Sequence, residues 1–307
     1  MRVLVTGSSG FLAKHVALHL GSERELDVLR FDLRQLPGND VPTIVGDLCD
    51  DRALERACEG VDAVVHFGAI GDVDVATRDP DLAQRTNVLG TRNVAKAAAA
   101  AGARVVYAST WEVYGPVVYQ PVDEQHPCAP HHVYGITKLG GEEELREAHR
   151  HRGLPVVVLR LGTAYGPGMR PNTVFRRFAD AAQRGESLQV QGSGAQWRQF
   201  THTSDIARAV RAALASGLDC DTLNVVADEL VTIRQLAELV SVRYGVPVSF
   251  GPERPGDPPS ARITSEKAAE LLDWQALVEF RRGLDLLLDQ LDQEHLQATS
   301  GREGWHA

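Results

Sequence analysis

The chain has 307 residues, of which 43% are hydrophobic and 24% charged, so it is long enough for one large or two modest domains with a sizeable core. Its 32 Lys and Arg against 41 Asp and Glu give a net charge of −9, which argues against a global attraction for nucleic acid or an anionic membrane. No apolar run approaches the ~18 residues that span a bilayer, and the 4 cysteines lack the paired spacing of a zinc site or a disulfide framework. We therefore expect a soluble, cytoplasmic protein that holds no metal and binds neither nucleic acid nor membranes.

Short apolar runs alternate with helix-like segments in the first half of the chain. The runs are rich in Val, Leu and Ile throughout, which is typical of strands buried on both faces of a sheet. This alternation predicts parallel strands joined by right-handed crossovers, that is, an α/β fold with a doubly wound parallel Rossmann sheet. The predicted strands are residues 2–5, 27–31, 43–45, 63–67, 105–108 and 156–161, and the predicted helices are residues 12–20, 52–57, 82–101 and 134–152.

Turn signals rich in Gly and Pro cluster after Gly162 and predict a second, smaller C-terminal lobe. We expect residues 200–226, with a strand at 222–226, to return to the first sheet. The polar tail at 294–307 is expected to fray. The predicted domains are residues 1–166 plus 199–227 for the first and residues 167–198 plus 228–307 for the second.

A glycine-rich turn at residues 7–13 follows the first predicted strand and opens a helix. Glycines at positions 7 and 10 let the backbone approach a pyrophosphate, whose charge the helix N-terminus receives. Asp32, ~20 residues further on, can accept both ribose hydroxyls and would repel a 2′-phosphate, so NAD is favoured over NADP. Asp47 and Leu48 offer a carboxylate and an apolar wall to the adenine. The cofactor-binding residues that we predict are Gly7, Ser9, Gly10, Phe11, Leu12, Asp32, Asp47, Leu48, Phe67, Gly68 and Ala69, together with Tyr134 and Lys138.

Tyr134 and Lys138 stand four residues apart at the start of a predicted helix, so their side chains are neighbours on one face. The lysine ammonium can lower the pKa of the phenol toward neutrality and can also bond the nicotinamide ribose. The preceding strand ends in Thr110. Because this spacing follows a dinucleotide-binding turn, it predicts acid–base chemistry beside a bound NAD. We interpret His66 as a packed strand-end residue and His132 as a solvated loop residue.

These segments together resemble the extended short-chain dehydrogenase/reductases, which include nucleotide-sugar epimerases, dehydratases and decarboxylases. The resemblance spans nearly the whole chain. It is carried by Thr-Gly-x-x-Gly at 6–10, His-x-x-Ala at 66–69, Asn87, Ser-Thr-x-Glu-Val-Tyr-Gly at 109–115, Tyr134 with Lys138, the segment 192–200, Arg-Pro-Gly-Asp at 254–257 and the helix end at 267–274. It implies that Tyr134 is the general base, Lys138 its activator and Thr110 a hydrogen-bond donor to the reacting oxygen. It also implies that Arg198 and Arg254 bind the substrate's diphosphate, for which guanidinium groups are well shaped.

The predicted helices 82–101 and 134–152 lie side by side in this architecture. Small residues on them would let the helices of a second copy pack closely. We therefore expect a homodimer with a four-helix interface, which the resemblance implies too.

Several positions depart from the family pattern or specialise it. Thr163 stands where the family usually has Asn. Trp111 replaces the acid that 4,6-dehydratases place beside the threonine, so dehydration lacks a proton donor for the departing hydroxyl. Glu112 is present, as in dehydratases and uronate decarboxylases, and Arg262 is placed to meet a substrate carboxylate. The predicted catalytic residues are Thr110, Glu112, Tyr134 and Lys138, and the predicted substrate-binding residues are Thr163, Arg198, Arg254, Asp257 and Arg262.

The resemblance implies oxidation at C4 of a bound nucleotide sugar by tightly held NAD. A carboxyl group at C5 then becomes a β-keto acid that loses carbon dioxide, so our first interpretation is a UDP-glucuronate decarboxylase that forms UDP-xylose or UDP-4-keto-pentose. The alternative is a UDP-hexose 4-epimerase, in which Glu112 only orients its loop. A non-catalytic NAD-binding regulator is disfavoured because Thr110, Tyr134 and Lys138 are all retained. An NADPH-dependent 4-keto-sugar reductase is disfavoured by Asp32. Uridine is the expected base, as in most such family members.

Overall fold

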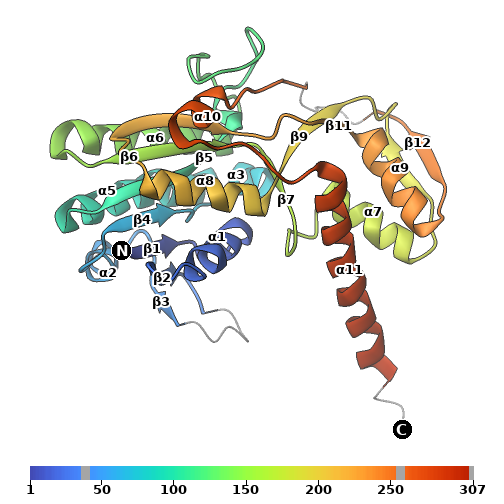
Figure 1. Ribbon diagram of the computed structural model, residues 1–307, viewed down its shortest axis with the longest axis horizontal. Coiled ribbons are helices and arrows are strands. Elements are labelled where there is room, and N and C mark those ends of the chain that lie inside the picture. The colour runs from blue at the N-terminus through green and yellow to red at the C-terminus, as the bar shows by residue number, and fades with distance from the viewer. Residues whose placement is uncertain (36–41, 254–259, 304–307) are drawn as a thin grey trace.

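The computed structural model describes residues 1–35, 42–253 and 260–303, and in this part of the chain seven strands form the main sheet (Figure 1). The strands run in the order β10-β6-β5-β4-β1-β2-β3, and all their pairings are parallel. Their bounds are β1 (Arg2–Thr6), β2 (Asp27–Asp32), β3 (Thr43–Val45), β4 (Ala63–His66), β5 (Arg104–Thr110), β6 (Val156–Leu161) and β10 (Cys220–Val225). The predicted doubly wound parallel sheet is therefore confirmed.

Helices cover both faces of this sheet (Figure 1). In β1, Val3 and Val5 point into the core on one face and Leu4 into the core on the other, which is why the strand is continuously apolar. The first face carries α1 (Phe11–Gly21), α8 (Thr203–Ala215) and α10 (Glu266–Leu272), and the second carries α2 (Asp51–Ala57), α5 (Gly90–Ala101) and α6 (Val133–Arg152).

The order of the strands reverses in the middle of the sheet. From β1 the chain proceeds to β2 and β3 on one side, and then to β4, β5, β6 and β10 on the other. The connections that leave the carboxyl ends of β1 and β4 therefore run in opposite directions. The gap between them is a topological switch point, the place where open α/β sheets bind their ligands.

A smaller lobe stands beside the carboxyl edge of the sheet (Figure 1). Its core is aromatic: the ring of Phe175 lies 4.9 Å from that of Phe200 and 5.4 Å from that of Tyr165, measured between centroids. The lobe contains a sheet of β7 (Thr163–Tyr165), β9 (Trp197–His202) and β11 (Leu230–Thr232), a pair of β8 (Leu188–Gln191) and β12 (Val248–Gly251), and the helices α7 (Val174–Gln183), α9 (Ile233–Tyr244) and α11 (Phe280–Glu303).

The chain crosses between the lobes at positions different from those predicted. β9 pairs with β7 and β11 in the small sheet, so residues 200–202 do not return to the main sheet, and the return begins with α8 and ends with β10. α11 extends to Glu303 and so runs into the polar tail that we expected to fray, and Leu287, Leu288 and Leu291, which precede that tail, anchor the helix to the core of the small lobe.

The predicted helix at 82–101 is interrupted. It consists of α4 (Pro80–Gln84), a π-helical turn η1 (Arg85–Leu89) and α5. The π turn carries the buried Asn87, whose side chain accepts a hydrogen bond from the backbone N–H of Ile70 (2.7 Å) and donates one to Thr137 Oγ1 (2.9 Å). A further helix, α3 (Val73–Arg78), begins at its N-cap Asp72 and was not predicted.

Among the helices in the described ranges, none combines the length and apolar character needed to cross a membrane.

Candidate active site

The turn after β1 packs closely against the loop after β4. Gly7 has a φ of +68°, and a Cβ atom built on it would lie 2.6 Å from both the Cα and the N of Gly68. Only glycine accommodates both the dihedral angle and the contact. A Cβ on Gly68 would in turn lie 2.7 Å from Cδ1 of Leu48. The Gly7 turn therefore packs directly against the loop after β4 at the switch point, where open α/β sheets bind their ligands.

Polar groups beside the Gly7 turn are placed to bind the ribose and the diphosphate of a dinucleotide. The Ser9 backbone N–H donates to Oδ2 of Asp32 (2.9 Å), which fixes this carboxylate at the end of β2 beside the loop. Because the N-cap of α1 is Gly10, the cap itself has no side chain to bond the first N–H groups of this helix, which are the groups that a diphosphate would use. The predicted residues thus converge from three segments: the β1–α1 turn, the end of β2 and the start of the loop after β4. They fit NAD.

His66 is a structural residue, as interpreted from its position at a strand end. It is fully buried, with Nδ1 2.6 Å from Thr6 Oγ1 and Nε2 3.0 Å from Thr91 Oγ1. Burial, with a smaller contribution from the charge of Lys138, lowers the pKa of His66 to about 3. The ring is therefore neutral and links β1, β4 and the helix beyond η1.

Tyr134 and Lys138 lie on the first turns of α6, opposite the end of β5. Burial, and then the charge of Glu112, raise the pKa of the Tyr134 phenol, whereas a hydrogen bond from Thr110 and the charge of Arg170 act in the opposite direction. Thr110 and Arg170 are thus groups that favour the phenolate in this structure, and the role of Lys138 as activator of Tyr134 stays a prediction. Lys138 is buried, with Nζ 4.0 Å from the centre of the Tyr107 ring, and burial lowers its pKa to about 7.

Arg170 was not singled out by any sequence motif. It follows the glycine-rich turn after β7, and its Nη1 lies 2.7 Å from Oδ2 of Asp72. The other carboxylate oxygen of Asp72 caps α3. The ion pair therefore connects the small lobe to the main domain next to Tyr134.

Glu112 and His132 form a contact that the sequence analysis did not predict. Glu112 lies on the 3-10 turn η2 (Trp111–Val113), and His132 is the N-cap of α6, where its Nδ1 accepts the backbone N–H of Gly135 (3.1 Å). The Nε2 of His132 lies 3.2 Å from Oε2 of Glu112. Its ring is nearly parallel to that of Tyr134, with 6.2 Å between centroids. His132 is therefore part of the site and not a solvated loop residue.

A buried ion pair between Glu142 and Arg160 stabilises the segments that carry these catalytic candidates. Glu142, one turn after Lys138, accepts hydrogen bonds from Ser109 Oγ (2.5 Å) and from Arg160 Nη2 (2.8 Å). Burial alone would raise the pKa of Glu142, but the hydrogen bonds from Arg160 and Ser109 and the charges of Arg160 and Arg146 together outweigh it and lower that pKa. Since Ser109 precedes Thr110, the pair fixes the end of β5 against α6.

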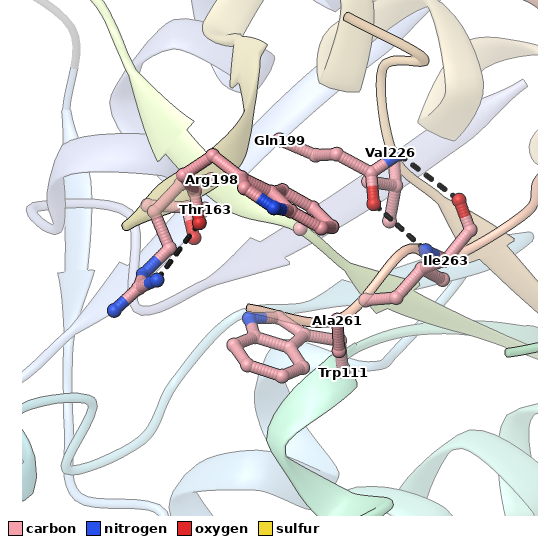
Figure 2. Close-up of a pocket in the computed structure, with 9 residues that line it drawn as sticks. Trp111, Thr163, Arg198, Gln199, Val226, Ala261 and Ile263 are labelled. Carbon is pink, nitrogen blue, oxygen red and sulfur yellow. Dashed lines mark hydrogen bonds between the residues drawn. The ribbon is translucent and has the colours of Figure 1, made fainter. Parts of the chain in front are cut away.

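A pocket lies between the two lobes, with Trp111 of η2 in its wall (Figure 2). The side-chain amide of Gln199 bonds both backbone groups of Ile263, at 2.7 Å and 3.0 Å, and Trp111 faces the same space. Nη1 of Arg198 donates to the carbonyl oxygen of Trp197 (2.8 Å). The lining residues are Trp111, Gly162, Thr163, Trp197, Arg198, Gln199, Val226, Ala261 and Ile263.

The predicted substrate-binding residues are only partly brought together. Thr163 and Arg198 line the pocket. Arg262 is exposed and absent from the lining, because its neighbours Ala261 and Ile263 face the pocket and successive side chains of an extended segment point to opposite sides. A direct contact between Arg262 and a substrate carboxylate therefore finds no support here. Arg254 and Asp257 lie outside the described residues.

Comparisons with known proteins agree with this geometry. The model of the NAD dependent epimerase/dehydratase family matches residues 3–225. The dTDP-glucose 4,6-dehydratase of Streptomyces niveus is 30% identical over 312 residues, covering 92% of this chain and 90% of that protein. UDP-glucuronic acid decarboxylase 6 of Arabidopsis thaliana is 29% identical over 301 residues, covering 94% and 88%. The structure of UDP-glucuronic acid 4-epimerase from Bacillus cereus, in complex with UDP-glucuronic acid and NAD, superposes with a TM-score of 0.86 at 26% identity, covering 96% of this chain and all of that one.

Proposed function

Since the chain belongs to the NAD-dependent epimerase/dehydratase family, whose members modify nucleotide sugars, we propose that it is a UDP-glucuronate decarboxylase. The product would be UDP-xylose or UDP-4-keto-pentose. The observation that carries the proposal is Glu112, a carboxylate near the Tyr134 phenol, combined with the absence of an acid at the neighbouring Trp111.

The Gly7 turn, Asp32 and the loop after β4 would hold NAD, which would supply the acceptor and later the donor of the hydride at sugar C4. The residues of the chain handle the proton. Tyr134 accepts the proton of the 4-hydroxyl, and Thr110 and Arg170 favour the phenolate that does so. Lys138 in its ammonium form would donate to the ribose hydroxyls of bound NAD.

The step after oxidation decides the reaction. A 4-keto uronate is a β-keto acid, so its C5–C6 bond breaks without an acid at C6, and the electron pair passes into the C4 enolate. The indole of Trp111 gives the pocket an apolar wall, and poor solvation of the substrate carboxylate favours its loss. Dehydration would instead require a proton donor for the C6 hydroxyl, and indole is not one.

A UDP-hexose 4-epimerase is the second candidate. The contact between Glu112 and the α6 cap residue His132 favours it, because Glu112 could then serve only to hold its loop. A non-catalytic NAD-binding regulator has no need of a buried lysine and a phenol gathered with Thr110, so we place it last.

The proposal is tested with Glu112→Gln, which removes the charge while keeping the size and hydrogen bonding of the side chain. With UDP-glucuronate, absorbance by reduced cofactor should still form, whereas release of carbon dioxide should slow. Glu147→Gln, at an exposed position of α6, is the matched control and should behave as wild type. A Glu112→Gln enzyme with unaltered turnover, together with untouched UDP-glucuronate and epimerised UDP-glucose in the wild type, would establish the epimerase instead.

A further inference from the structure

The N-cap of α6 is unusual because its side chain has a second polar atom directed at the site. Nδ1 of His132 accepts the Gly135 N–H, as an N-cap side chain does. An imidazole nitrogen that accepts a hydrogen bond carries no proton, so in the neutral ring the proton lies on Nε2. The cap thereby fixes the tautomer, and it directs an N–H donor toward Glu112.

Glu112 needs such a donor. Its Oε2 is buried and accepts no hydrogen bond from the residues that the structure describes, although Nε2 of His132 is only 3.2 Å away. A buried carboxylate oxygen without a hydrogen bond is costly, and a small rotation of either side chain brings the N–H into line with it. Both side chains are partly exposed, at 23% for His132 and 29% for Glu112, so the pair lies at the wall of the site rather than in the core.

We propose that His132 is a positioning residue for Glu112. The α6 N-cap holds its Nε2–H toward the carboxylate, and this contact keeps the Glu112 side chain directed at the sugar during the step that follows oxidation at C4. This inference rests on the proposed role of Glu112 but not on which product forms. His132 itself touches neither the sugar nor the cofactor in this assignment.

Among the described residues, few charged or titratable groups face His132 that could bind its Nε2–H in place of Glu112. Glu112 faces it from η2, and Tyr134 and His131 flank it on its own segment, with ring centroids 6.2 Å and 5.2 Å away. Arg170 acts on Tyr134 and is itself paired with Asp72. Of these, Glu112 is the one at ion-pair distance from Nε2.

The experiment separates the two roles of His132, which are the N-cap hydrogen bond with Gly135 and the contact with Glu112. His132→Asn keeps a good N-cap side chain, since Asn accepts from the N3 backbone N–H, but it removes the donor to Glu112. We expect a melting temperature close to wild type and an unchanged rate of cofactor reduction, but decay of the reduced cofactor slowed by on the order of tenfold or more, below the full effect of an acid–base group. His131→Asn, at the exposed neighbouring position, should leave both rates unchanged.

Coupling between the two residues completes the test. In the Glu112→Gln background, His132→Asn should have no further effect on the decay, because the charged carboxylate that His132 positions is already absent. Additive effects, or a His132→Asn enzyme with wild-type decay, would overturn the inference. Decay is followed with whichever of UDP-glucuronate and UDP-glucose the wild type oxidises, and release of carbon dioxide takes its place as the readout if the ketone leaves and the cofactor stays reduced. An enzyme that releases no carbon dioxide therefore contradicts the proposed decarboxylation and still tests His132.

Discussion

The Nζ atom of Lys138 lies 4.0 Å from the centre of the Tyr107 ring, in the interior and one helical turn from Tyr134. Burial lowers the pKa of Lys138 to about 7, against the opposing effect of the Glu142 carboxylate. The face of the ring provides some of the attraction that water would otherwise give the ammonium. This lysine therefore exchanges its proton in the neutral pH range, unlike a lysine in water.

We expect NAD to bind more weakly as the pH rises through about 7, because the ammonium form of Lys138 donates to the ribose and the amine form, which predominates above that pH, attracts it less. For one coupled proton the dissociation constant can rise by at most about tenfold per pH unit. Titration calorimetry across this range measures it. Lys138→Met should bind NAD weakly with no such dependence, and a wild-type constant that is flat with pH would contradict the assignment.

Gly7→Ala should abolish NAD binding and lower the melting temperature. The added Cβ would meet the Gly68 backbone at 2.6 Å, and the turn would have to open. Gly102→Ala is a matched control, since Gly102 has a φ of +71° with nothing within 4 Å of the added atom. The difference between the two variants isolates the collision from the strain of the dihedral angle. If the two variants bind NAD equally well, the Gly7 turn is not part of the cofactor site.

Tyr134→Phe should retain NAD and nucleotide binding but lose turnover by on the order of 10²–10⁴-fold, because it deletes the proton acceptor and keeps the aromatic ring. Arg170→Gln should have a subtler effect. Arg170 lowers the pKa of Tyr134, so its loss should raise that pKa and move the alkaline rise of kcat to higher pH. Initial rates measured against pH report the loss of turnover in Tyr134→Phe and the shift of the pH profile in Arg170→Gln. Near-normal activity of Tyr134→Phe would refute the role of Tyr134 as the base.

The homodimer remains a prediction. α5 and α6 lie side by side and are joined by the ion pair of Arg92 with Glu144 (2.6 Å), and α6 exposes half of Ile136. We expect light scattering at micromolar concentration to give the mass of a dimer, and Ile136→Glu to convert it to a monomer of similar thermal stability. A monomeric wild type would exclude the four-helix interface.

Local patterns allowed the sheet, the Gly7 turn and the Tyr134–Lys138 pair to be predicted, because each depends on residues close together in sequence. The contact of Glu112 with His132 could not be predicted in this way. It forms only when the turn after β5 meets the N-terminus of α6, and an N-cap histidine looks like any polar loop residue. The π turn at Asn87 was missed for a related reason: the hydrogen bond that holds it comes from Ile70 on another segment.

The most direct test of the account is the mass of the product that the purified wild-type enzyme makes from UDP-glucuronate. We predict a nucleotide sugar lighter by one carbon dioxide, with the cofactor either restored or left reduced according to whether the pentose is released as the alcohol or the ketone. A product of unchanged mass with inverted configuration at C4, or one lighter by water, would contradict decarboxylation.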